Sequence, residues 1–429
     1  MRRVAIVGAG YAGMAAALTV AGKGGQVSVF ETARQLGGRA RRVDYGGETL
    51  DNGQHILSGA YTVLLSLMAQ VGVPANALRR VPLGLFMPPA FCLQAPRWPA
   101  PWHLVGALAC AQGLSVTDRI AAIRLLRALQ RSGFAVEPDQ TVAQLLARHH
   151  QPDRLNRYLW EPLTVSALNT PIERASANVL AHVLRDTLGA GREASDLLLP
   201  QIDLGELFPE PAARWLEARG HIVRRGCRVR SVETSADASY VTQTDHAESF
   251  DAVILAVAPQ QLASIGLPAE LPVIELPVEP IVTMYLKFDG PVRLSRPMVG
   301  QSRQHVHWFF DRRELSTGVA QPDGLIAAVI SAASGMRAAD SHALQRSVLS
   351  ELQQHTGTLP KLKWAKLVNE KFATFACTPS VETLRPPTAT ALPGLYLAGD
   401  YVASDYPGTL ETAVRNGVAA GLAAMQPHP

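Results

Sequence analysis

The pattern of apolar and polar positions at the start of the chain predicts a strand, a helix and a second strand. Residues 4–7 (VAIV) form an apolar run that ends at a group of glycines, and residues 27–31 (VSVFE) form a second run. Between them, residues 11–24 carry an alanine-rich helical pattern. This order and spacing are typical of a parallel βαβ unit. We therefore expect an α/β fold.

The pattern changes between residues 79 and 191, where proline-rich apolar sequence is followed by helices. Residues 117–131 and 141–150 each begin at a threonine whose hydroxyl is suited to cap a helix. Residues 251–259 (DAVILAVAP) are almost continuously apolar, which is typical of a buried central strand. We expect a helical insertion, after which the first sheet resumes.

A second sheet and a closing helix are predicted further along. Residues 281–288 and 325–331 have the composition of strands, residues 341–354 predict a helix, and another helix is expected from Thr409 to about Met425. The expected organisation is a discontinuous dinucleotide-binding domain formed by residues 1–78, 196–279 and 391–429, a helical insertion at 79–195, and a substrate domain with a mixed sheet at 280–390.

Composition indicates an ordinary globular protein. The 429 residues are 47% hydrophobic and 18% charged, with a formal net charge of +4. Basic residues are scattered, apart from Arg39, Arg41 and Arg42, so we expect no nucleic-acid partner. The four cysteines form no CxxC pair and no metal-ligand spacing, so we expect no metal site and a reducing, cytoplasmic compartment.

One long stretch has no charged side chain. From Trp98 to Thr117 the chain contains no Asp, Glu, Lys or Arg, which reaches the length of a membrane span. Pro99 and Pro101 interrupt it, and its tryptophans suit an interfacial or substrate-lining segment better. Peripheral contact with the cytoplasmic face of a membrane is therefore one interpretation, and a plain buried segment is the other.

A glycine motif lies at the first strand–helix junction. Gly8, Gly10 and Gly13 form GAGYAG, where missing side chains let backbone amides and the positive helix end approach a pyrophosphate. Glu31 follows Gly13 by 18 residues, close to the ~20 expected for the acid that accepts hydrogen bonds from ribose hydroxyls. The sequence therefore predicts a dinucleotide site.

The segment after Glu31 distinguishes between dinucleotides. ETARQLGGRA, with Gly37, Gly38 and Arg39, resembles the second glycine motif of the FAD-dependent amine oxidoreductase superfamily, which includes amine oxidases, protoporphyrinogen oxidases and phytoene desaturases. In that family the segment runs beside the pyrophosphate. The resemblance implies non-covalently bound FAD in a glutathione-reductase-like Rossmann domain.

The C-terminal region also resembles that superfamily. Gly399 and Asp400, followed by PGTLETAVRNGVAAG, match its flavin motif. The resemblance implies that Asp400 accepts a hydrogen bond from a ribityl hydroxyl. The helix opening at Thr409 and Leu410 would direct its positive end at the N1 and O2 edge of the flavin. Val229 is a further candidate for cofactor binding.

Further segments resemble the squalene-associated flavoproteins of bacterial hopanoid biosynthesis. They are LDNGQHILSGAY, LWEPLTVSALNTPIERASA, DLLLP and WFFDR. This resemblance implies FAD-dependent reduction of hydroxysqualene to squalene, with the long apolar isoprenoid bound by residues 79–195. No second dinucleotide motif is evident, so an external electron donor is expected.

The implied reaction needs a proton donor and an apolar tunnel shielded from water. His55 is the leading donor candidate because it lies in the flavin-proximal segment and titrates near neutrality, although a structural role is an equal alternative. Asp51 is expected to support it or to cap a turn. Candidates of second rank are Gln54, Trp160, Glu161 and Asn169, the last with a turn-forming alternative.

Other functions remain open at this stage. A carotenoid-type desaturase would use the same fold on an isoprenoid and run the oxidation instead. An amine oxidase is less favoured because no aromatic cage motif accompanies the C-terminal helix. A flavin-containing scaffold that presents an isoprenoid without turnover is the alternative from a different class.

Overall fold

A computed structural model describes residues 1–234, 240–243, 247–269, 271, 273–315, 323–335 and 341–426. Five parallel strands form the first sheet, and they come from three separate stretches of the sequence. In spatial order they are β10 (Ile222–Arg225), β2 (Gln26–Glu31), β1 (Arg3–Val7), β14 (Ala252–Leu255) and β20 (Leu395–Leu397). The apolar runs predicted at 4–7, 27–31 and 251–259 are therefore neighbouring strands.

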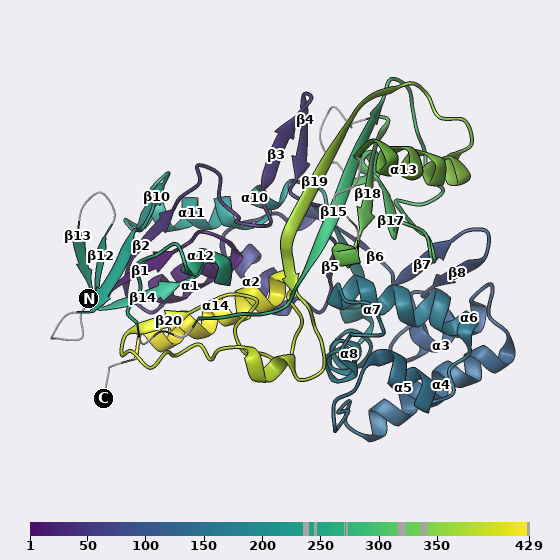
Figure 1. Ribbon diagram of the computed structural model, residues 1–429, viewed down its shortest axis with the longest axis horizontal. Coiled ribbons are helices and arrows are strands. Elements are labelled where there is room, and N and C mark those ends of the chain that lie inside the picture. Colours follow the sequence, from purple (N-terminus) through teal and green to yellow (C-terminus); the bar gives the residue numbers. More distant parts are fainter. Residues whose placement is uncertain are drawn as a thin grey trace.

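Two helices that lie far apart in the sequence pack together against this sheet. Helix α1 (Tyr11–Gly22) and helix α14 (Leu410–Ala424) lie side by side in Figure 1. Their contact needs glycine, because a methyl group placed on Gly417 would lie 2.1 Å from the carbonyl oxygen of Ala12. The small residues of the last helix thus bring the C-terminus against the first βαβ unit.

The second sheet is antiparallel, so the prediction of a mixed sheet is wrong. Its order is β16 (Met298–Gly300), β17 (Trp308–Asp311), β18 (Leu325–Ile330), β15 (Val278–Phe288) and β19 (Leu362–Phe375). Strands β18 and β19 run in the same direction and are joined through α13 (Ser341–Thr356), but β15 lies between them. A helical crossover therefore occurs without a parallel pair.

Helices between residues 102 and 195 gather at the end of the molecule opposite the parallel sheet (Figure 1). They are α3 (Trp102–Cys110), α4 (Val116–Arg131), α5 (Val142–Arg148), α6 (Asp153–Leu155), α7 (Glu161–Leu168), α8 (Ala177–Leu184) and α9 (Arg192–Ser195), with π-helical turns Asn156–Trp160 and Arg185–Gly189. Ser115 caps α4 and Thr141 caps α5, each in a reciprocal capping box. These capping boxes explain where α4 and α5 begin.

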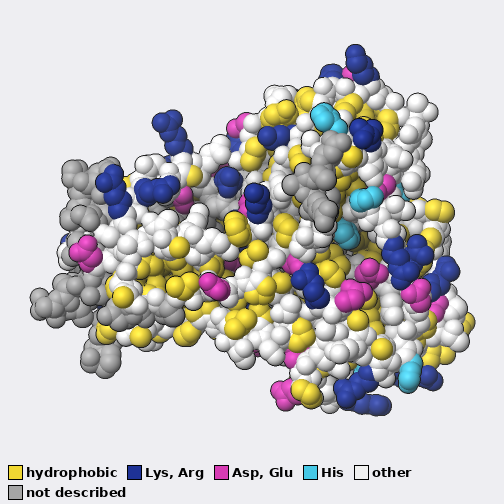
Figure 2. Space-filling model, in the orientation of Figure 1, with side chains coloured by type: hydrophobic (Ala, Val, Ile, Leu, Met, Phe, Trp, Pro, Cys, Tyr) yellow, Lys and Arg dark blue, Asp and Glu magenta, His cyan; other side chains and the backbone are white. Residues whose placement is uncertain are grey.

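Shorter elements connect these bodies. They are β3 (Arg42–Tyr45), β4 (Glu48–Asp51), β5 (Leu57–Ser58), α2 (Thr62–Gln70), β6 (Leu78–Val81), β7 (Gly84–Met87), β8 (Phe91–Gln94), β9 (Leu197–Pro200), α10 (Leu204–Leu207), α11 (Pro209–Glu217), β11 (Ser231–Thr234), β12 (Tyr240–Gln243), β13 (Ala247–Phe250) and α12 (Pro259–Leu262). In the part of the chain that the structure describes, no helix is long and apolar enough to cross a membrane. Figure 2 shows Lys and Arg side chains interspersed with acidic and apolar ones on the face in view.

Candidate functional site

The carboxyl ends of three parallel strands open onto one large cavity of about 1090 Å³. Val7 at the end of β1, Glu31 at the end of β2 and Ala256 just after β14 line it. Ligand sites typically measure about 300–1,000 Å³. The volume of this cavity is therefore just above the usual range, and the cavity lies where open α/β sheets bind nucleotides.

The three glycines of the first motif have distinct structural roles. Gly8 has φ +105°, and a methyl group there would lie 2.6 Å from the carbonyl oxygen of Ala256. Gly13 does not line the cavity, because it packs the helix against the loop; a methyl group on it would lie 1.9 Å from the Gly8 oxygen. Gly10 lines the cavity, and a methyl group there meets nothing closer than 3.9 Å. The open space beside Gly10 suits a closely approaching phosphate.

Glu31 holds this loop in place. Its Oε2 accepts a hydrogen bond from the Ala9 amide and its Oε1 accepts one from the Ala33 amide, both at 2.8 Å. Each carboxylate oxygen retains lone-pair capacity for a ribose hydroxyl. Val229 is buried and lines the same cavity.

An ion pair joins the second glycine motif to the C-terminal motif. Arg39 Nη2 lies 2.5 Å from Asp400 Oδ1, and Arg39 Nη1 donates to the carbonyl of Ala373 at the end of β19. Burial disfavours the charge on Arg39, but the Asp400 carboxylate outweighs this and raises the arginine pKa. Gly37 and Gly38, with φ +111° and +61°, also line the cavity. Sequence reasoning assigned Arg39 and Asp400 separately to the cofactor and missed this pair.

We call the part of the cavity lined by the glycine motifs, Glu31, Arg39 and Asp400 the cradle. One side chain in the cradle has a hydroxyl group without a hydrogen-bond partner among the described residues. Tyr401 is 3% exposed and lines the cavity, and its hydroxyl has no hydrogen-bond partner among the described residues. A buried hydroxyl without a partner is costly unless a ligand completes it. The sequence shows that Tyr401 directly follows Asp400, but it does not show which way the Tyr401 side chain points.

The N-terminus of α14 forms another wall of the cavity. Thr409 caps this helix by accepting a hydrogen bond from the Thr412 amide, and residues 408–413 line the cavity. The acid in the first turn, Glu411, accepts hydrogen bonds from the amides of Val63 and Leu64, at the start of α2. The positive end of α14 thus lies beside the cavity with Gly399, Asp400 and Leu410.

His55 lines the cavity with its ring fixed by the backbone. Its Nδ1 lies 2.9 Å from the Gly53 carbonyl oxygen, which can only accept, so Nδ1 carries a proton. Burial and the Arg39 charge lower the pKa of His55 below 6.5, although the Gly53 bond opposes the shift. In the neutral ring Nε2 is therefore a bare acceptor, and donation requires the protonated form.

Asp51 lies behind the cavity wall, not on it. The carboxyl group is 2% exposed and accepts a hydrogen bond from the Leu204 amide at 2.9 Å. Burial raises its pKa to about 6, although Arg312 lies 3.8 Å away and lowers it. Arg312 also donates to Gln54 Oε1 at 2.7 Å, and Gln54 does line the cavity. The WFFDR segment contributed to the family resemblance, but the contacts of its arginine, Arg312, with Asp51 and Gln54 were not predicted.

Thr283 was also missed, because one hydroxyl in an apolar strand gives no sequence signal. The residue is 1% exposed and lines the cavity, and its Oγ1 has no partner among the described residues. A methyl group on Gly53 would lie 3.7 Å from this oxygen and 3.8 Å from His55 Cε1. Thr283 and His55 therefore border the same small space.

The candidates of second rank differ in their hydrogen bonds and in their position relative to the cavity. Asn169 adopts a left-handed conformation, donates to the Glu279 carbonyl and accepts from the Ala332 amide, so it acts as a turn residue. Trp160 lines the cavity and donates to Gln151 Oε1 at 3.0 Å. Glu161 does not line the cavity.

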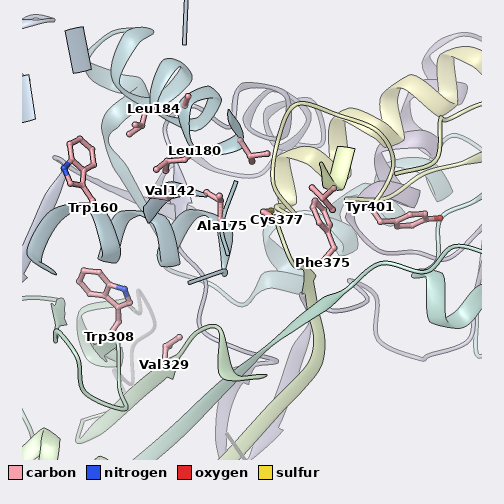
Figure 3. Packing of buried hydrophobic residues seen from close by; sticks show 14 of the residues in the cluster. Val142, Trp160, Ala175, Leu180, Leu184, Trp308, Val329, Phe375, Cys377 and Tyr401 are labelled. Atoms are coloured by element: carbon pink, nitrogen blue, oxygen red, sulfur yellow. The ribbon is translucent and has the colours of Figure 1, made fainter. Parts of the chain in front are cut away.

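The remainder of the cavity is an apolar chamber. Trp160 comes from the helical body and Trp308 from strand β17 of the second sheet (Figure 3). The chamber is the part of the cavity walled by these two and by Leu104, Leu108, Leu159, Leu163, Leu180, Leu184, Met298 and Val329. It is continuous with the glycine-lined cradle, and the polar residues that line the cavity include His55, Thr283, Ser166, Asn169, Thr187 and Ser331.

Residues 11–421 match the family model for flavin-containing amine oxidoreductases. The chain belongs to this family. Its cofactor is FAD, in agreement with the dinucleotide cradle described above, and the chain is an FAD-dependent oxidoreductase. The predicted superfamily is thereby confirmed.

Two kinds of enzyme are similar to this chain over nearly its full length. Hydroxysqualene dehydroxylases from Sinorhizobium fredii and Zymomonas mobilis are each 28% identical to this chain; the matches cover 97% of it and 96% and 98% of those proteins. A zeta-carotene desaturase from Synechocystis sp. is 23% identical, with 99% of this chain and 97% of that protein covered.

Solved structures agree in fold. An oxidoreductase from Methanosarcina mazei superposes with a TM-score of 0.74 at 15% identity, covering 98% of this chain and 99% of the other. Cyclohexylamine oxidase from Brevibacterium oxydans gives a TM-score of 0.67 at 17% identity, covering 99% and 98%. The α/β fold is therefore that of the FAD-dependent amine oxidases.

Proposed function

We propose that this enzyme removes the hydroxyl group of hydroxysqualene by reduction and releases squalene and water. The observation that carries the proposal is the mostly apolar chamber that is continuous with the FAD cradle. The similarity to hydroxysqualene dehydroxylases supports the same substrate class. An apolar chamber suits an isoprenoid and excludes water from the reacting carbon.

We propose that the cradle residues hold FAD as the sequence suggested. Glu31 and Val229 would contact the adenosine portion, while Gly8, Gly10, Gly37 and Gly38 would let the backbone approach the pyrophosphate. Asp400, Thr409 and Leu410 would lie at the ribityl and ring end, with Gly399 beside them and Arg39 holding Asp400 in place. When bound and reduced, the flavin supplies a hydride.

The reaction breaks a carbon–oxygen bond and forms a carbon–hydrogen bond. One proton must reach the departing hydroxyl so that it leaves as water, and the hydride replaces it on carbon. We assign the proton to Nε2 of protonated His55. The Thr283 hydroxyl, which has no partner in the described structure, would donate to the same oxygen and orient it. Asp51 lies behind the wall and has no direct role in this scheme.

The domain organisation is part of the proposal. Residues 1–78, 196–279 and 391–429 would form the discontinuous FAD domain, because the parallel strands come from these stretches. Residues 79–195 would be the helical insertion that encloses the isoprenoid, with residues 280–390 supplying the sheet beneath it. An external donor would reduce the flavin.

Anaerobic single turnover tests this function. Enzyme with pre-reduced FAD should be reoxidised by hydroxysqualene with formation of squalene. A carotenoid-type desaturase is the second candidate, supported by the 23% identical relative. If reduced enzyme is inert toward hydroxysqualene while oxidised enzyme is bleached by a saturated isoprenoid, the desaturase assignment replaces ours. If neither mixture changes the flavin spectrum, a scaffold without turnover remains.

A further inference from the structure

Exposed large apolar side chains are concentrated in the uncharged stretch and at the start of α4. Of the 13 exposed large hydrophobic side chains in the described structure, five fall between residues 98 and 120. We call these five the docking patch: Trp98, Trp102, Val105, Val116 and Ile120, with exposed fractions of 51%, 63%, 47%, 65% and 43%. Isolated apolar side chains are normal on a surface. Trp98, Trp102 and Val105 are not isolated, because the Trp98 ring lies against α3 and the other two lie three residues apart on that helix, and such a group indicates an interaction site.

Helix α3 lies between its own part of the docking patch and the apolar chamber. Trp102 and Val105 are exposed on α3, whereas Leu104 and Leu108 of the same helix line the cavity. A methyl group on Gly106 would lie 2.7 Å from the Trp98 ring, so this ring rests against α3. One short helix therefore has apolar side chains toward both the outside and the substrate chamber.

The segment that carries the docking patch has almost only basic charged residues. Between residues 82 and 136 the sequence has five arginines and a single acid, Asp118. Asp118 is buried, where its carboxylate caps the start of α4. Arg97 is exposed next to Trp98, and Arg124 and Arg127 are exposed on α4. An exposed apolar cluster with tryptophans and accompanying arginines matches a bilayer interface that contains anionic lipid.

We propose that the docking patch seats the enzyme on an anionic bilayer, and that the isoprenoid passes between the lipid and the chamber beside α3. The second clause rests on the proposed function, because it assumes a lipid-dissolved substrate. Seating is peripheral, since α3 has only nine residues. A protein surface would not by itself require the arginines, whereas anionic headgroups attract them.

Flotation of the FAD-loaded enzyme with vesicles tests the seating. We expect binding to vesicles of phosphatidylcholine with phosphatidylglycerol, and much weaker binding to phosphatidylcholine alone. Trp102→Ser/Val105→Ser should reduce the bound fraction about tenfold, and Arg124→Gln/Arg127→Gln should remove the preference for phosphatidylglycerol. None of these residues lines the cavity, so FAD content and the melting temperature should stay unchanged. Val273→Ser/Leu422→Ser, which alters exposed apolar residues elsewhere, is the matched control and should float like the parent.

Turnover separates this inference from the proposed function. With hydroxysqualene in vesicles, Trp102→Ser/Val105→Ser should be slower than the parent, and with substrate in detergent the two should be equal. A parent that turns over in detergent but never floats overturns the inference alone. A parent that floats but never turns over overturns the function and leaves the seating intact. A dimer that the double substitution dissociates would assign the docking patch to a second copy of the chain and overturn the lipid assignment.

Discussion

At the scale of single residues, His55 is the polar group of the cavity whose hydrogen bond and pKa say most about the proposed chemistry. His55 has its Nδ1 proton committed to the Gly53 carbonyl, and burial lowers its pKa. The resting ring is therefore an acceptor. The residue can act as an acid only in the fraction of molecules in which it is protonated, and that fraction grows as the pH falls.

This gives a pH dependence with a definite sign. The single-turnover rate with pre-reduced enzyme should rise about tenfold per pH unit as the pH falls toward the lowered His55 pKa, and should level off below it. His55→Gln keeps much of the shape but cannot donate from a charged ring, so it should lose about 100 to 10,000-fold in rate and lose the pH slope. Stopped-flow flavin absorbance measures both. A His55→Gln rate within a few-fold of the parent would remove His55 as the donor.

Asp51 gives a second residue-scale prediction, on stability. Its folded pKa of about 6 lies above its ordinary value of 3.8, so in that interval the folded state holds a proton that the unfolded state has lost. The free energy of unfolding should therefore fall as the pH rises through this interval. One pKa unit corresponds to about 1.4 kcal/mol, so the effect amounts to a few kcal/mol at most. Urea unfolding of the parent and of Asp51→Asn between these pH values checks it: the parent should lose stability relative to the variant as the pH rises, and parallel curves would contradict the assignment.

At the scale of elements, the sequence predicted most strands and helices but not every pairing. The apolar runs at 4–7 and 27–31 are strands β1 and β2, because buried parallel strands are recognised by continuous apolar sequence. The sheet at residues 278–375 was expected to be mixed and is antiparallel. Pairing depends on which strand lies between two others, and local sequence does not contain that information. The same limit applies to Asp51, which was expected to support His55 or to cap a turn: its hydrogen bond from the Leu204 amide, at the start of α10, joins residues about 150 positions apart and could not be read from local sequence.

The contact of α1 with α14 gives an element-scale prediction. Gly417→Val adds atoms where even a methyl group would lie 2.1 Å from the Ala12 carbonyl oxygen, so the helices must separate. Overpacking of this kind costs about 1–3 kcal/mol. FAD should also bind more weakly, because the N-terminal ends of both helices border the cradle. The matched control is Ala419→Val on the exposed side of α14, which should cost about 0.5 kcal/mol and leave FAD affinity unchanged. Thermal melts and FAD titration measure the two; equal behaviour would contradict the packing argument.

At the scale of the whole molecule, the FAD cradle collects residues from distant parts of the chain. Glu31, Val229 and Asp400 line one cavity although they come from three stretches of sequence. The two glycine motifs and the C-terminal motif could be proposed as FAD contacts from sequence, because phosphate and flavin contacts use short local patterns, and residues of all three motifs line the same cavity. The Arg39–Asp400 pair that connects them could not, because it depends on how the two ends of the chain fold together.

A ligand held by three stretches of chain should stabilise the whole fold against unfolding. Apoprotein should melt at a lower temperature than holoprotein, and FAD at about 100 times its Kd should restore about 2.7 kcal/mol. FMN should not, because it lacks the adenosine that Glu31 would bind.

Glu31→Ala removes the acceptor for the Ala9 and Ala33 amides as well as that for the ribose, so the apoprotein should also lose stability. Its FAD affinity should fall by about 1–3 kcal/mol, the range for leaving buried donors without partners. Melting curves of both apoproteins with FAD or FMN separate the two effects: a variant whose apoprotein is weakened but whose FAD affinity equals the parent's would restrict Glu31 to holding the loop, and stabilisation of the parent by FMN equal to that by FAD would show that the adenosine portion of the cradle is not used.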